Sequence, residues 1–492
     1  MSSAQASVAS AKQAALDTLL PDATRQLEAF AGGDLCNDSR RVAPGDIFLA
    51  LPGAAVDGRQ YIAEALSAGA CLVLAEAQDG LPGDDRVLAV SQLRDKLPDL
   101  VKGFYRDPSS GMSVLAVTGT NGKTSVVEFT GQLLRALGVS TGCIGTLGAR
   151  TESRPASALN TTPDLLALTR QLRSWLDVGV NHVAMEASSH ALAQGRLLGM
   201  QLHSACFTNL SRDHLDYHGS VEEYAAAKLS LFTDFGLTRA IYNADDAIAA
   251  RVAEIATAEV VGISCADPGA DVLVEISDPT RFALDLKTPW GETTVAPSLS
   301  GRFNAFNVAA AITGVVGMGF AFNTVCDAAN DLCPIPGRME RFTDAQGFQV
   351  VVDYAHTPDA LENALRALKP ETIGRLWVVF GCGGDRDTGK RPMMGEVACH
   401  WADEVIVTSD NPRGESPELI ARDILQACNG NTRTELDRES AIAVAMAGAA
   451  SGDTILVAGK GHEDYQEVSG VRTPFDDREV VLRLLRTEEV VR

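Results

Sequence analysis

The sequence has few basic residues, few aromatic residues and no closely spaced pair of cysteines, and these shortages exclude several classes of protein. Its 492 residues include 42 lysines and arginines against 64 aspartates and glutamates, a formal net charge of −22. Such a balance repels a nucleic-acid backbone or an anionic membrane surface, so we expect neither as a partner. The ten cysteines contain no C-x-x-C pair, which favours reduced thiols in a core over a disulfide framework or a zinc site.

Long apolar runs are also missing. The longest, Val308 to Phe322, is interrupted by Thr313 and three glycines and is shorter than the roughly 20 residues that a membrane span needs, so we predict one buried helix there. The first 20 residues are alanine-rich with one lysine and lack the basic start and apolar core of a signal peptide. We therefore expect a cytoplasmic protein without membrane insertion.

The residues that are present are typical of a large α/β protein. Hydrophobic residues make up 46% and charged residues 22%, as in globular chains, and the length suggests about three domains. Strand-like runs alternate with helical patterns, which indicates a mostly parallel sheet with crossover helices. The proline-rich segment 332–337 is the linker candidate. We predict a small α/β domain over residues 1–110, a central P-loop ATPase-type domain with a mostly parallel sheet over 111–336, and a Rossmann-like C-terminal domain over 337–492.

A glycine loop between a strand and a helix carries the strongest chemical signal. A buried-strand run ends at Val117, residues 118–124 read TGTNGKT, and a helical pattern follows. Glycines let backbone N–H groups approach phosphates, Lys123 can reach the outer phosphates, and Thr124 can ligate Mg²⁺. Val117 stands where the full Walker pattern has its first glycine, so an ordinary strand-to-helix turn is the alternative.

Three strands in the last third of the chain end in polar or glycine-rich loops, over residues 381–387, 408–413 and 459–463. Ligands of open parallel sheets bind beyond the carboxyl ends of the strands, so we predict a second ligand site at these loops. Arg386 and Arg413 lie on two of them. Each arginine can form a bidentate pair with a carboxylate, although exposed arginines are common and each could simply be solvated.

Glu186, His214 and Lys228 are candidate metal ligands. Glu186 follows the predicted strand 182–185, where a carboxylate could hold a metal against phosphate oxygens, and a solvated strand end is the alternative. His214 lies in the polar run 211–218, which could also be a loop of surface hydrogen bonds. Lys228 lies on an apolar helical stripe and should point inward, where its pKa falls and its neutral amine can be carbamylated to an anion. A snorkelling lysine is the alternative.

Together these motifs resemble those of the Mur ligase family, ATP-dependent enzymes that add amino acids to the UDP-muramoyl peptide precursor of peptidoglycan. The resemblance covers nearly the whole chain. It rests on residues 118–124 and on NTTP at 160–163, EASSH at 186–190, TNLSRDHLD at 208–216, GRFN at 301–304, GRMER at 337–341 and DYAH at 353–356. The DNPR sequence at 410–413 is similar to the signature of members that add meso-diaminopimelate, and the lysine-adding relatives lack that arginine.

The resemblance implies roles for four sets of residues. The ATP site would contain Gly119, Thr120, Asn121, Gly122, Lys123, Thr124, Ser125, Asn304, Arg338 and Asp353. The UDP-peptide would contact Ser39, Asn160, Thr161, Thr162, Ser188, Gln194 and Arg196, with the uracil near the apolar stretch 54–56. Diaminopimelate would contact Arg386, Asp410, Asn411, Pro412, Arg413, Gly459 and Glu463. The metal ligands for Mg²⁺ would be Thr124, Glu186, His214 and a carbamylated Lys228, and the catalytic residues Lys123, His214 and Lys228.

The implied enzyme is an acid–amino-acid ligase of peptidoglycan synthesis that uses ATP and Mg²⁺. It would phosphorylate a carboxylate of UDP-N-acetylmuramoyl-L-alanyl-D-glutamate, and the amine of meso-diaminopimelate would then capture the acyl phosphate. We expect a monomer. Three alternatives are open. A folylpolyglutamate synthase would share the loop and the acyl-phosphate chemistry, a P-loop kinase would need no amine acceptor, and a nucleotide-regulated scaffold would only bind.

Overall fold

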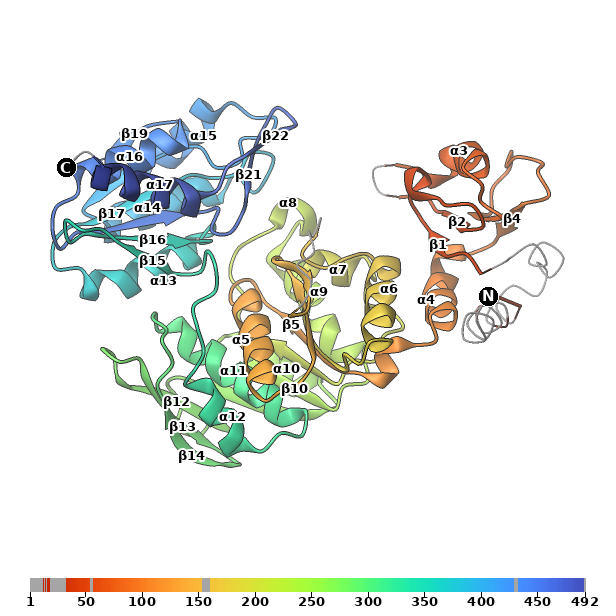
Figure 1. Cartoon of the computed structure of the whole chain (residues 1–492), viewed down its shortest axis with the longest axis horizontal. Helices are drawn as coiled ribbons and strands as arrows, with labels where there is room; N and C mark the ends of the chain where they lie inside the picture. The colour runs from red at the N-terminus through yellow and green to blue at the C-terminus, as the bar shows by residue number, and fades with distance from the viewer. Residues whose placement is uncertain are drawn as a thin grey trace. The chain divides into compact units, whose positions relative to one another are not determined.

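The computed structural model of the chain (Figure 1) describes Lys12, Ala14, Leu16, Asp17 and residues 32–53, 56–152, 160–428 and 432–490, without the side chains of residues 249, 250 and 487–490. Most of the first 20 residues, and Ala54 and Ala55 of the predicted uracil stretch, lie outside the described residues. The chain forms two compact units. One contains Met1–Val114 and Ser140–His203, and the other contains Leu115–Val139 and Ser204–Arg492.

The first unit begins with a four-stranded parallel sheet. Its strands β1 (Leu35–Cys36), β2 (Ile47–Ala50), β3 (Leu72–Glu76) and β4 (Val87–Val90) lie in sequence order, and α3 (Ile62–Ser67) and α4 (Leu93–Phe104) follow β2 and β4. Side chains alternate along a strand, so Ile47 and Leu49 pack with α4 on one face, while Phe48 and Ala50 pack with α3 on the other.

Three further strands belong to the first unit. They are β6 (Thr141–Gly145), β7 (Gly148–Arg150) and β8 (His182–Glu186), accompanied by helices α6 (Leu165–Leu176) and α7 (Ser189–Ala193). Strand β6 pairs in parallel with β8 and antiparallel with β7. Glu186 is the last residue of β8, so the predicted strand ended one residue too early. These three strands belong to a ten-stranded mixed sheet.

The second unit contains the order β14-β13-β12-β11-β10-β9-β5 of that sheet. Parallel strands are β5 (Ser113–Thr118), β9 (Ser204–Phe207), β10 (Arg239–Asn243), β11 (Glu259–Ser264) and β12 (Val272–Asp278), and β13 (Ala283–Thr288) and β14 (Gly291–Val295) are antiparallel. The sequence analysis missed the antiparallel part. Strand β13 buries Leu284 and Leu286 but exposes Asp285 between them, so it lacks the continuous apolar run of the parallel strands.

The helices of this sheet in the second unit are α5 (Lys123–Ala136), α8 (Leu215–His218), α9 (Val221–Thr233), α10 (Ala249–Ile255), α11 (Phe303–Gly317) and α12 (Phe322–Ala329). Helix α11 packs against α5. The prediction of one helix over 308–322 is wrong, because the chain turns at Gly319, which has a φ of +98° that an ordinary helix cannot contain. Among the helices described, none is both long and apolar enough to cross a membrane.

The last sheet has the strand order β15-β16-β20-β17-β18-β19. Its strands are β15 (Glu340–Thr343), β16 (Gln349–Asp353), β17 (Leu376–Phe380), β18 (Glu404–Val407), β19 (Thr432–Thr434) and β20 (Thr454–Ala458), and only β15 pairs antiparallel among these described strands. The helices are α13 (Pro358–Leu368), α14 (Lys390–Trp401), α15 (Pro417–Leu425), α16 (Arg438–Gly448) and α17 (Asp477–Val490). A hairpin of β21 (Tyr465–Val468) and β22 (Val471–Pro474) precedes α17.

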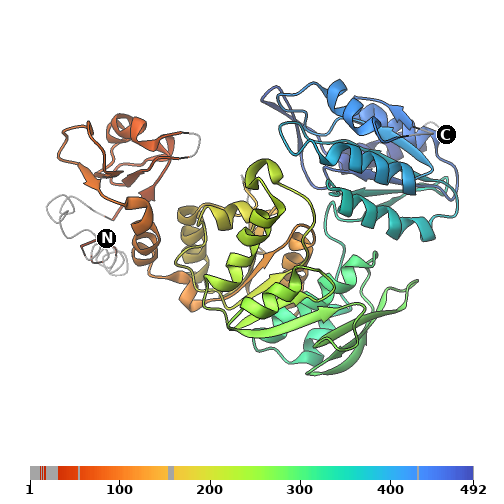
Figure 2. The same cartoon turned by 180° about the vertical axis from the view of Figure 1, so that it is seen from behind.

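Helices cover both faces of this C-terminal sheet. Helices α13, α14 and α15 pack on one face, and α16 and α17 pack on the other. Figure 1 shows α16 and α17 toward the viewer, and Figure 2 shows the opposite face with α13 and α14. The predicted fold class of three α/β domains is confirmed by the three sheets with their helices. The boundaries at residues 110 and 336 stay predictions.

Candidate active site

The glycine loop lies between β5 and α5, and the loop after β9 anchors it. Thr120 N–H donates to the Asn209 carbonyl at 2.8 Å, and Asn121 N–H donates to the side-chain oxygen of Asn209 at 2.9 Å. Gly119 has a φ of +140°, and a Cβ added there would lie 1.9 Å from Thr208 Oγ1. Only glycine therefore fits at this position, and the loop is held in place at the N-terminus of α5, where anions are favoured.

Lys123 and Lys228 converge on one carbonyl of this loop. Lys123 Nζ donates to the carbonyls of Gly119 and Thr120 at 2.9 and 2.8 Å, and Lys228 Nζ, from α9, donates to the Gly119 carbonyl at 2.7 Å. Lys228 is 1% exposed, so the predicted inward orientation is confirmed. Burial and the nearby Lys123 lower the pKa of Lys228 well below its usual value, although Asp213 acts in the opposite direction. The surroundings of Lys228 therefore favour its neutral amine more than water does.

Asp213 connects His214 with two residues of the C-terminal part of the same unit. Its Oδ2 lies 3.4 Å from His214 Nε2 and 3.6 Å from His356 Nε2, and its Oδ1 lies 3.8 Å from Lys390 Nζ. Burial alone would raise the pKa of Asp213, but His356, Lys390 and His214 hold it well below its usual value. An ionised carboxylate therefore stands beside the predicted metal ligand His214.

The predicted magnesium ligands are divided between the two units, with Glu186 in the first and Thr124, His214 and Lys228 in the second. In the described part of the chain, no three histidine, cysteine, aspartate or glutamate side chains form a group that could hold a metal. Three of the four predicted ligands fit Mg²⁺ in their chemistry if Lys228 is carbamylated, because the hydroxyl of Thr124, the carboxylate of Glu186 and a carbamate are oxygen donors, whereas the His214 imidazole is a nitrogen donor. An ammonium at Lys228 would not fit. This ligand set stays a prediction.

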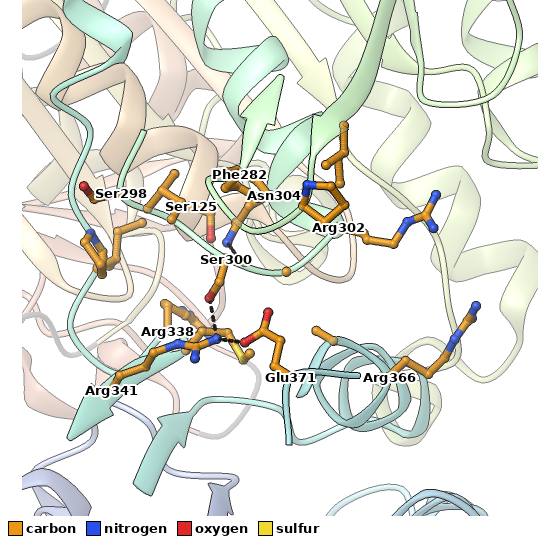
Figure 3. A pocket seen from close by; sticks show the side chains of 18 of the residues that line it. Ser125, Phe282, Ser298, Ser300, Arg302, Asn304, Arg338, Arg341, Arg366 and Glu371 are labelled. Atoms are coloured by element: carbon orange, nitrogen blue, oxygen red, sulfur yellow. Dashed lines mark hydrogen bonds and ion pairs between the residues drawn. The ribbon is translucent and has the colours of Figure 1, made fainter. Parts of the chain in front are cut away.

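A cavity of about 1080 Å³ lies beside the first turn of α5, lined by Ser125, Asn304 and Arg338 of the predicted ATP site (Figure 3). Arg338 Nη2 donates to Thr124 Oγ1 at 2.9 Å, and its guanidinium lies 4.3 Å from the centre of the Tyr354 ring. The buried Nε of Arg338 has no hydrogen-bond partner in the described structure. One donor of the guanidinium is therefore left unsatisfied by the described residues.

Another wall of the cavity is a hydrogen-bonded network (Figure 3). Arg341 Nη2 donates to Ser300 Oγ at 3.1 Å and to Glu371 Oε2 at 2.6 Å. Asn304 Nδ2 donates to the Ser300 carbonyl at 2.7 Å. The network fixes the side chain of Asn304, and Asn304 was predicted for ATP while Ser300, Arg341 and Glu371 were not.

Asp353 is not one of the residues that line this cavity. Its two carboxylate oxygens accept the N–H groups of Met339 and Ala355, each at 2.8 Å. Burial raises the pKa of Asp353. The carboxylate therefore holds the segment after Arg338 in place, and its predicted contact with ATP stays a prediction.

In the first unit, several residues predicted for the peptide end gather around Glu186. Thr146 donates its N–H to Glu186 Oε1 at 2.8 Å and its hydroxyl to Oε2 at 3.2 Å. Thr162 Oγ1 donates to the Glu186 carbonyl at 2.7 Å and accepts the Ser188 N–H at 3.1 Å. Arg196 Nη1 donates to the Thr162 carbonyl at 2.6 Å. The sequence analysis missed Thr146, whose position directly after a buried strand was the available signal.

The other residues predicted to contact the UDP-peptide make no hydrogen bond to Glu186 among those described. Thr161 accepts a hydrogen bond from Thr146 at 3.3 Å, and Gln194 Oε1 accepts from Arg196 Nε at 3.0 Å. Asn160 is exposed. Ser39 follows β1 and donates to Glu64 Oε2 at 3.1 Å, so its hydroxyl is engaged beside the N-terminal sheet and apart from the Glu186 cluster.

The loops after β17 and β18 bring the two predicted arginines together. A Cβ added to Gly383 would lie 2.8 Å from Arg413 Nη1 and 3.8 Å from Arg386 Cγ, so both side chains flank this glycine. Arg413 Nη1 donates to the Gly384 carbonyl at 2.9 Å. The backbone of Arg413 has a φ of +51°, and its N–H donates to the Glu467 carbonyl of β21 at 3.0 Å. The hairpin therefore fixes the arginine that the resemblance assigns to diaminopimelate.

Beside Arg413, the buried residues Asn411 and Lys460 form a triad with the partly exposed Glu463. Asn411 Nδ2 donates to Glu463 Oε2 at 2.9 Å, and Lys460 Nζ donates to Asn411 Oδ1 and Glu463 Oε2, both at 3.1 Å. A Cβ added to Gly459 would lie 2.6 Å from Asp410 Oδ2, so Gly459 leaves room for that carboxylate. The sequence analysis missed Lys460, although it lies between two predicted residues of one loop.

A buried ion pair between Arg438 and Asp477 lies next to the loops after β18 and β20. Arg438 Nε and Asp477 Oδ1 are 2.7 Å apart, and both side chains are 0% exposed. Arg438 also donates to the carbonyls of Ser409 and Ala458 at 3.3 and 3.0 Å. Pro412 is buried between the anchored residues. Arg438 therefore joins the ends of β18 and β20, which carry the predicted acceptor residues.

These features define a nucleotide-binding α/β protein with an anchored phosphate loop and a second site built from arginine-bearing strand-end loops. Comparison with known protein families supports this description. Residues 35–105 match the family described as Mur ligase family, catalytic domain, residues 117–315 match the Mur ligase middle domain, and residues 337–461 match the Mur ligase, glutamate ligase domain. The chain belongs to the Mur ligase family.

Individual proteins give a finer comparison. The chain is 44% identical over 483 residues to UDP-N-acetylmuramoyl-L-alanyl-D-glutamate–2,6-diaminopimelate ligase of Pseudomonas aeruginosa, which covers 96% of this chain and 99% of that protein. A solved structure of a ligase with the same name matches with a TM-score of 0.66 at 36% identity, over 93% of this chain and 95% of the other. Folylpolyglutamate synthase of Mycobacterium tuberculosis, solved with ADP, matches at 20% identity with a TM-score of 0.61, over 73% of this chain and 90% of the other, which shows the fold alone.

Proposed function

We propose that this chain is an ATP-dependent ligase that joins meso-diaminopimelate to UDP-N-acetylmuramoyl-L-alanyl-D-glutamate in peptidoglycan synthesis. The observation that carries the proposal is the 44% identity to the Pseudomonas aeruginosa ligase over nearly the full length of both chains. Sequence similarity to that ligase over the central domain alone would indicate only that both proteins use ATP. Likeness over the first and last domains as well supports shared recognition of the precursor and of the amino acid.

In the first half-reaction, a carboxylate of the UDP-dipeptide attacks the γ-phosphorus of ATP, and an acyl phosphate and ADP result. Lys123 starts α5 next to the anchored loop, and Arg338 contacts Thr124 with an unused buried donor. Both cations would offset the negative charge that develops on the transferred phosphoryl group. The fixed loop holds the phosphates in line for attack.

Mg²⁺ belongs to the proposed reaction. Its proposed ligands are Thr124, Glu186, His214 and a carbamylated Lys228, and when bound it supplies positive charge at the phosphates. The carboxylate of Asp213, 3.4 Å from His214 Nε2, orients that imidazole.

In the second half-reaction, the amine of diaminopimelate attacks the carbonyl carbon of the acyl phosphate. An amide bond forms, phosphate leaves, and the amine loses a proton. Arg413 and Arg386 would pair with the carboxylate at the far end of the amino acid, and Glu463 would accept its ammonium. We further propose that the chain is a cytoplasmic monomer.

Product analysis tests the proposal directly. The purified protein should release ADP and phosphate only when ATP, the UDP-dipeptide and diaminopimelate are all present, with one amide formed for each ADP. ADP formation with a folate and glutamate would favour the folylpolyglutamate synthase alternative. A stable phosphorylated product without any amine acceptor would favour a kinase, and binding without turnover would favour a scaffold.

The choice of amino acid is tested at Arg413. A pocket that pairs the second carboxylate with an arginine, such as the partly buried Arg413, leaves that cation unpaired when lysine binds. Such sites can reject an analogue that lacks the paired group by roughly 10⁴-fold. Arg413→Ala should raise the KM for diaminopimelate on the order of 10²-fold, with the KM for ATP little changed. Steady-state kinetics with each amino acid measures both effects, and Arg433→Ala on exposed β19 is the matched control.

Two outcomes would contradict this assignment. Comparable kcat/KM values for lysine and diaminopimelate in the unmodified enzyme would remove the specificity claim, though the ligase claim would stand. Equal losses with both amino acids in Arg413→Ala would show that Arg413 only braces its loop, through its hydrogen bond to the Gly384 carbonyl.

A further inference from the structure

Arg391 is a buried cation next to the two strand-end loops that the proposed function assigns to diaminopimelate. It is the second residue of α14, and its side chain is 2% exposed. Nη2 lies 2.8 Å from Glu415 Oε1, and Nη1 lies 3.0 Å from Asp423 Oδ2. A guanidinium is costly to bury unless opposite charges and hydrogen bonds compensate it. Arg391 is therefore held between two carboxylates, and only that of Glu415 belongs to one of these loops.

Glu415 links this arginine to the loop after β17. Its Oε1 accepts the N–H of Asp385 at 2.5 Å as well as the Nη2 donor of Arg391. The hydrogen bond from Arg391 lowers the pKa of Glu415, so this carboxylate is ionised at neutral pH. An ionised acceptor makes a stronger hydrogen bond than a neutral one. Glu415 therefore fixes the direction of the Asp385 N–H.

The same peptide group also holds the arginine that is proposed to bind the second carboxylate. The Asp385 N–H and the Gly384 carbonyl belong to one planar peptide group, so fixing one of them also fixes the direction of the other. Arg413 Nη1 donates to the Gly384 carbonyl at 2.9 Å and, in a longer contact, to the Asn411 carbonyl at 3.5 Å. Both described hydrogen bonds of this side chain use Nη1, which leaves Nε and Nη2 for a carboxylate.

The backbone around this peptide group needs contacts to hold its conformation. Asp385 has a φ of +52°, which a residue other than glycine adopts only where its surroundings stabilise it. Gly384 N–H donates to the Asn411 carbonyl at 2.9 Å, and Gly414 N–H donates to Asp385 Oδ2 at 2.9 Å. Glu415 adds the contact to the N–H of Asp385, so the two loops stabilise each other at this point.

We propose that Glu415 and Arg391 are positioning residues of the acceptor site, which act on the amino acid through Arg413. Arg391 holds Glu415, and Glu415 holds the N–H of Asp385. The carbonyl of the same peptide group then orients the Arg413 guanidinium toward the second carboxylate of diaminopimelate. An oriented guanidinium pairs with a carboxylate through two parallel hydrogen bonds, and this pairing weakens if the guanidinium is free to rotate. The inference rests on the proposed function, which assigns that carboxylate to Arg413.

The test measures whether Glu415 acts through Arg413. Glu415→Ala should raise the KM for diaminopimelate by about tenfold, the loss expected for one hydrogen bond to a charged group, with the kcat and the KM for ATP little changed. In an Arg413→Ala background, the same substitution should raise that KM by less than about twofold, because the residue through which it acts is already absent. Steady-state kinetics of the two single variants and the double variant measures this coupling.

Asp423→Ala is the matched control. Asp423 pairs with the same arginine, and its side chain is 31% exposed against 28% for Glu415. Asp423 lies on α15 and makes no hydrogen bond to either loop in the described part of the chain, so its loss should change the KM for diaminopimelate by less than about twofold. Thermal unfolding checks that each variant folds. Glu415→Met, of similar volume and without an acceptor, replaces Glu415→Ala if that variant does not fold.

Three results would overturn the inference. One is an unchanged KM for diaminopimelate without the Glu415 carboxylate. The others are the same fold increase with and without Arg413, and an equal increase in Asp423→Ala, because a purely structural role of the network predicts both. Failure of the unmodified enzyme to use diaminopimelate would instead overturn the proposed function.

Discussion

The ammonium of Lys228 stands in surroundings that disfavour its charge. The side chain is 1% exposed, and its Nζ donates to the same Gly119 carbonyl that accepts from Lys123. Two cations at one carbonyl repel each other, and burial adds a desolvation cost. After the ammonium loses one proton, the neutral amine can form an N–C bond with CO₂ and lose a second proton, which gives a carbamate anion. The positive charge is thereby replaced by a negative one, so that the repulsion by Lys123 becomes attraction. Burial and the charge of Lys123 therefore both lower the pKa of Lys228 and favour the predicted carbamate.

A chemical rescue experiment tests the carbamate at this residue. Lys228→Ala should lose nearly all ligase activity, on the order of 10³-fold, because the proposed metal site loses an anionic ligand. Acetate or formate should restore part of the activity, because either one supplies a carboxylate in the vacated space. The measurement is ADP release with increasing carboxylate concentration. Lys287→Ala, at an exposed position on β13, is the control and should stay fully active without rescue.

Full activity of Lys228→Ala would leave the buried lysine with a purely structural role. An inactive variant that no small carboxylate rescues would instead indicate that the side chain is needed only to hold the Gly119 carbonyl.

The burial of a single residue could be predicted where the sequence around it has a clear helical periodicity. The apolar stripe around Lys228 predicted its burial, because helical periodicity is a property of one segment. Thr146 and Lys460 were missed, because their importance comes from partners remote in sequence, Glu186 for Thr146 and Asn411 for Lys460. A sequence shows which residues are polar, whereas a three-dimensional contact decides which of them share a site.

At the scale of elements, the glycine loop depends on its neighbour in the sheet. Strands β5 and β9 pair in parallel and end together, which places Thr208 and Asn209 against the loop. The loop conformation is therefore set by two strand ends, and the Walker pattern with Val117 in place of glycine still yields an anchored loop.

Gly119→Ala tests this element. An added Cβ would lie 1.9 Å from Thr208 Oγ1 at a φ of +140°, so the loop must move away from its anchor. ATP affinity should fall by about tenfold or more, since a displaced loop loses its N–H contacts to the phosphates. Titration with a fluorescent ATP analogue measures the affinity. Gly138→Ala, beyond α5 at a φ of +74° but with no atom within 4 Å of its added Cβ, is the control for backbone strain without a clash. Wild-type affinity in Gly119→Ala would mean that this loop does not bind the phosphates.

Elements with a continuous apolar run were predicted to within about two residues, such as β9 and β17, because buried parallel strands exclude polar side chains. The antiparallel strands β13 and β14 were not, because half-exposed strands carry alternating polar residues. The apolar run 308–322 was read as one helix, although two helices occur there, since composition alone does not say where glycine breaks a helix. A continuous apolar run therefore located buried strands, but it did not show where a helix ends.

At the scale of the whole molecule, the predicted first domain is bound to a helix well outside its predicted limit of residue 110. Leu165 and Leu166 of α6 belong to the same apolar cluster as Leu49 of β2. Arg170 of α6 pairs with Asp34 at 2.8 Å, and Tyr105 donates to the same carboxylate at 2.5 Å. The boundary at residue 110 was predicted from composition and turn residues. Neither of these features shows that the apolar core of the N-terminal sheet also includes residues of α6.

The pair between Arg170 and Asp34 therefore contributes to the stability of the first unit. Arg170→Ala should lower that stability by about 1–2 kcal/mol, because Asp34 and the Tyr105 hydroxyl lose a charged partner in partly buried surroundings. We expect the first calorimetric transition to shift down by about 2–6 °C, since 1 kcal/mol moves the midpoint of a domain of this size by a few degrees. The KM for ATP should not change, because the glycine loop belongs to the other unit.

Arg173→Ala is the matched control on the same helix. Arg173 pairs with Asp177 one turn away, and the two side chains are 20% and 54% exposed. Loss of this ion pair itself should cost less than about 0.5 kcal/mol. Equal shifts in the two variants would show that α6 has merely lost helix stability. A shift in Arg170→Ala alone would show that the N-terminal sheet and α6 unfold as one cooperative body, which a domain ending at residue 110 would not do.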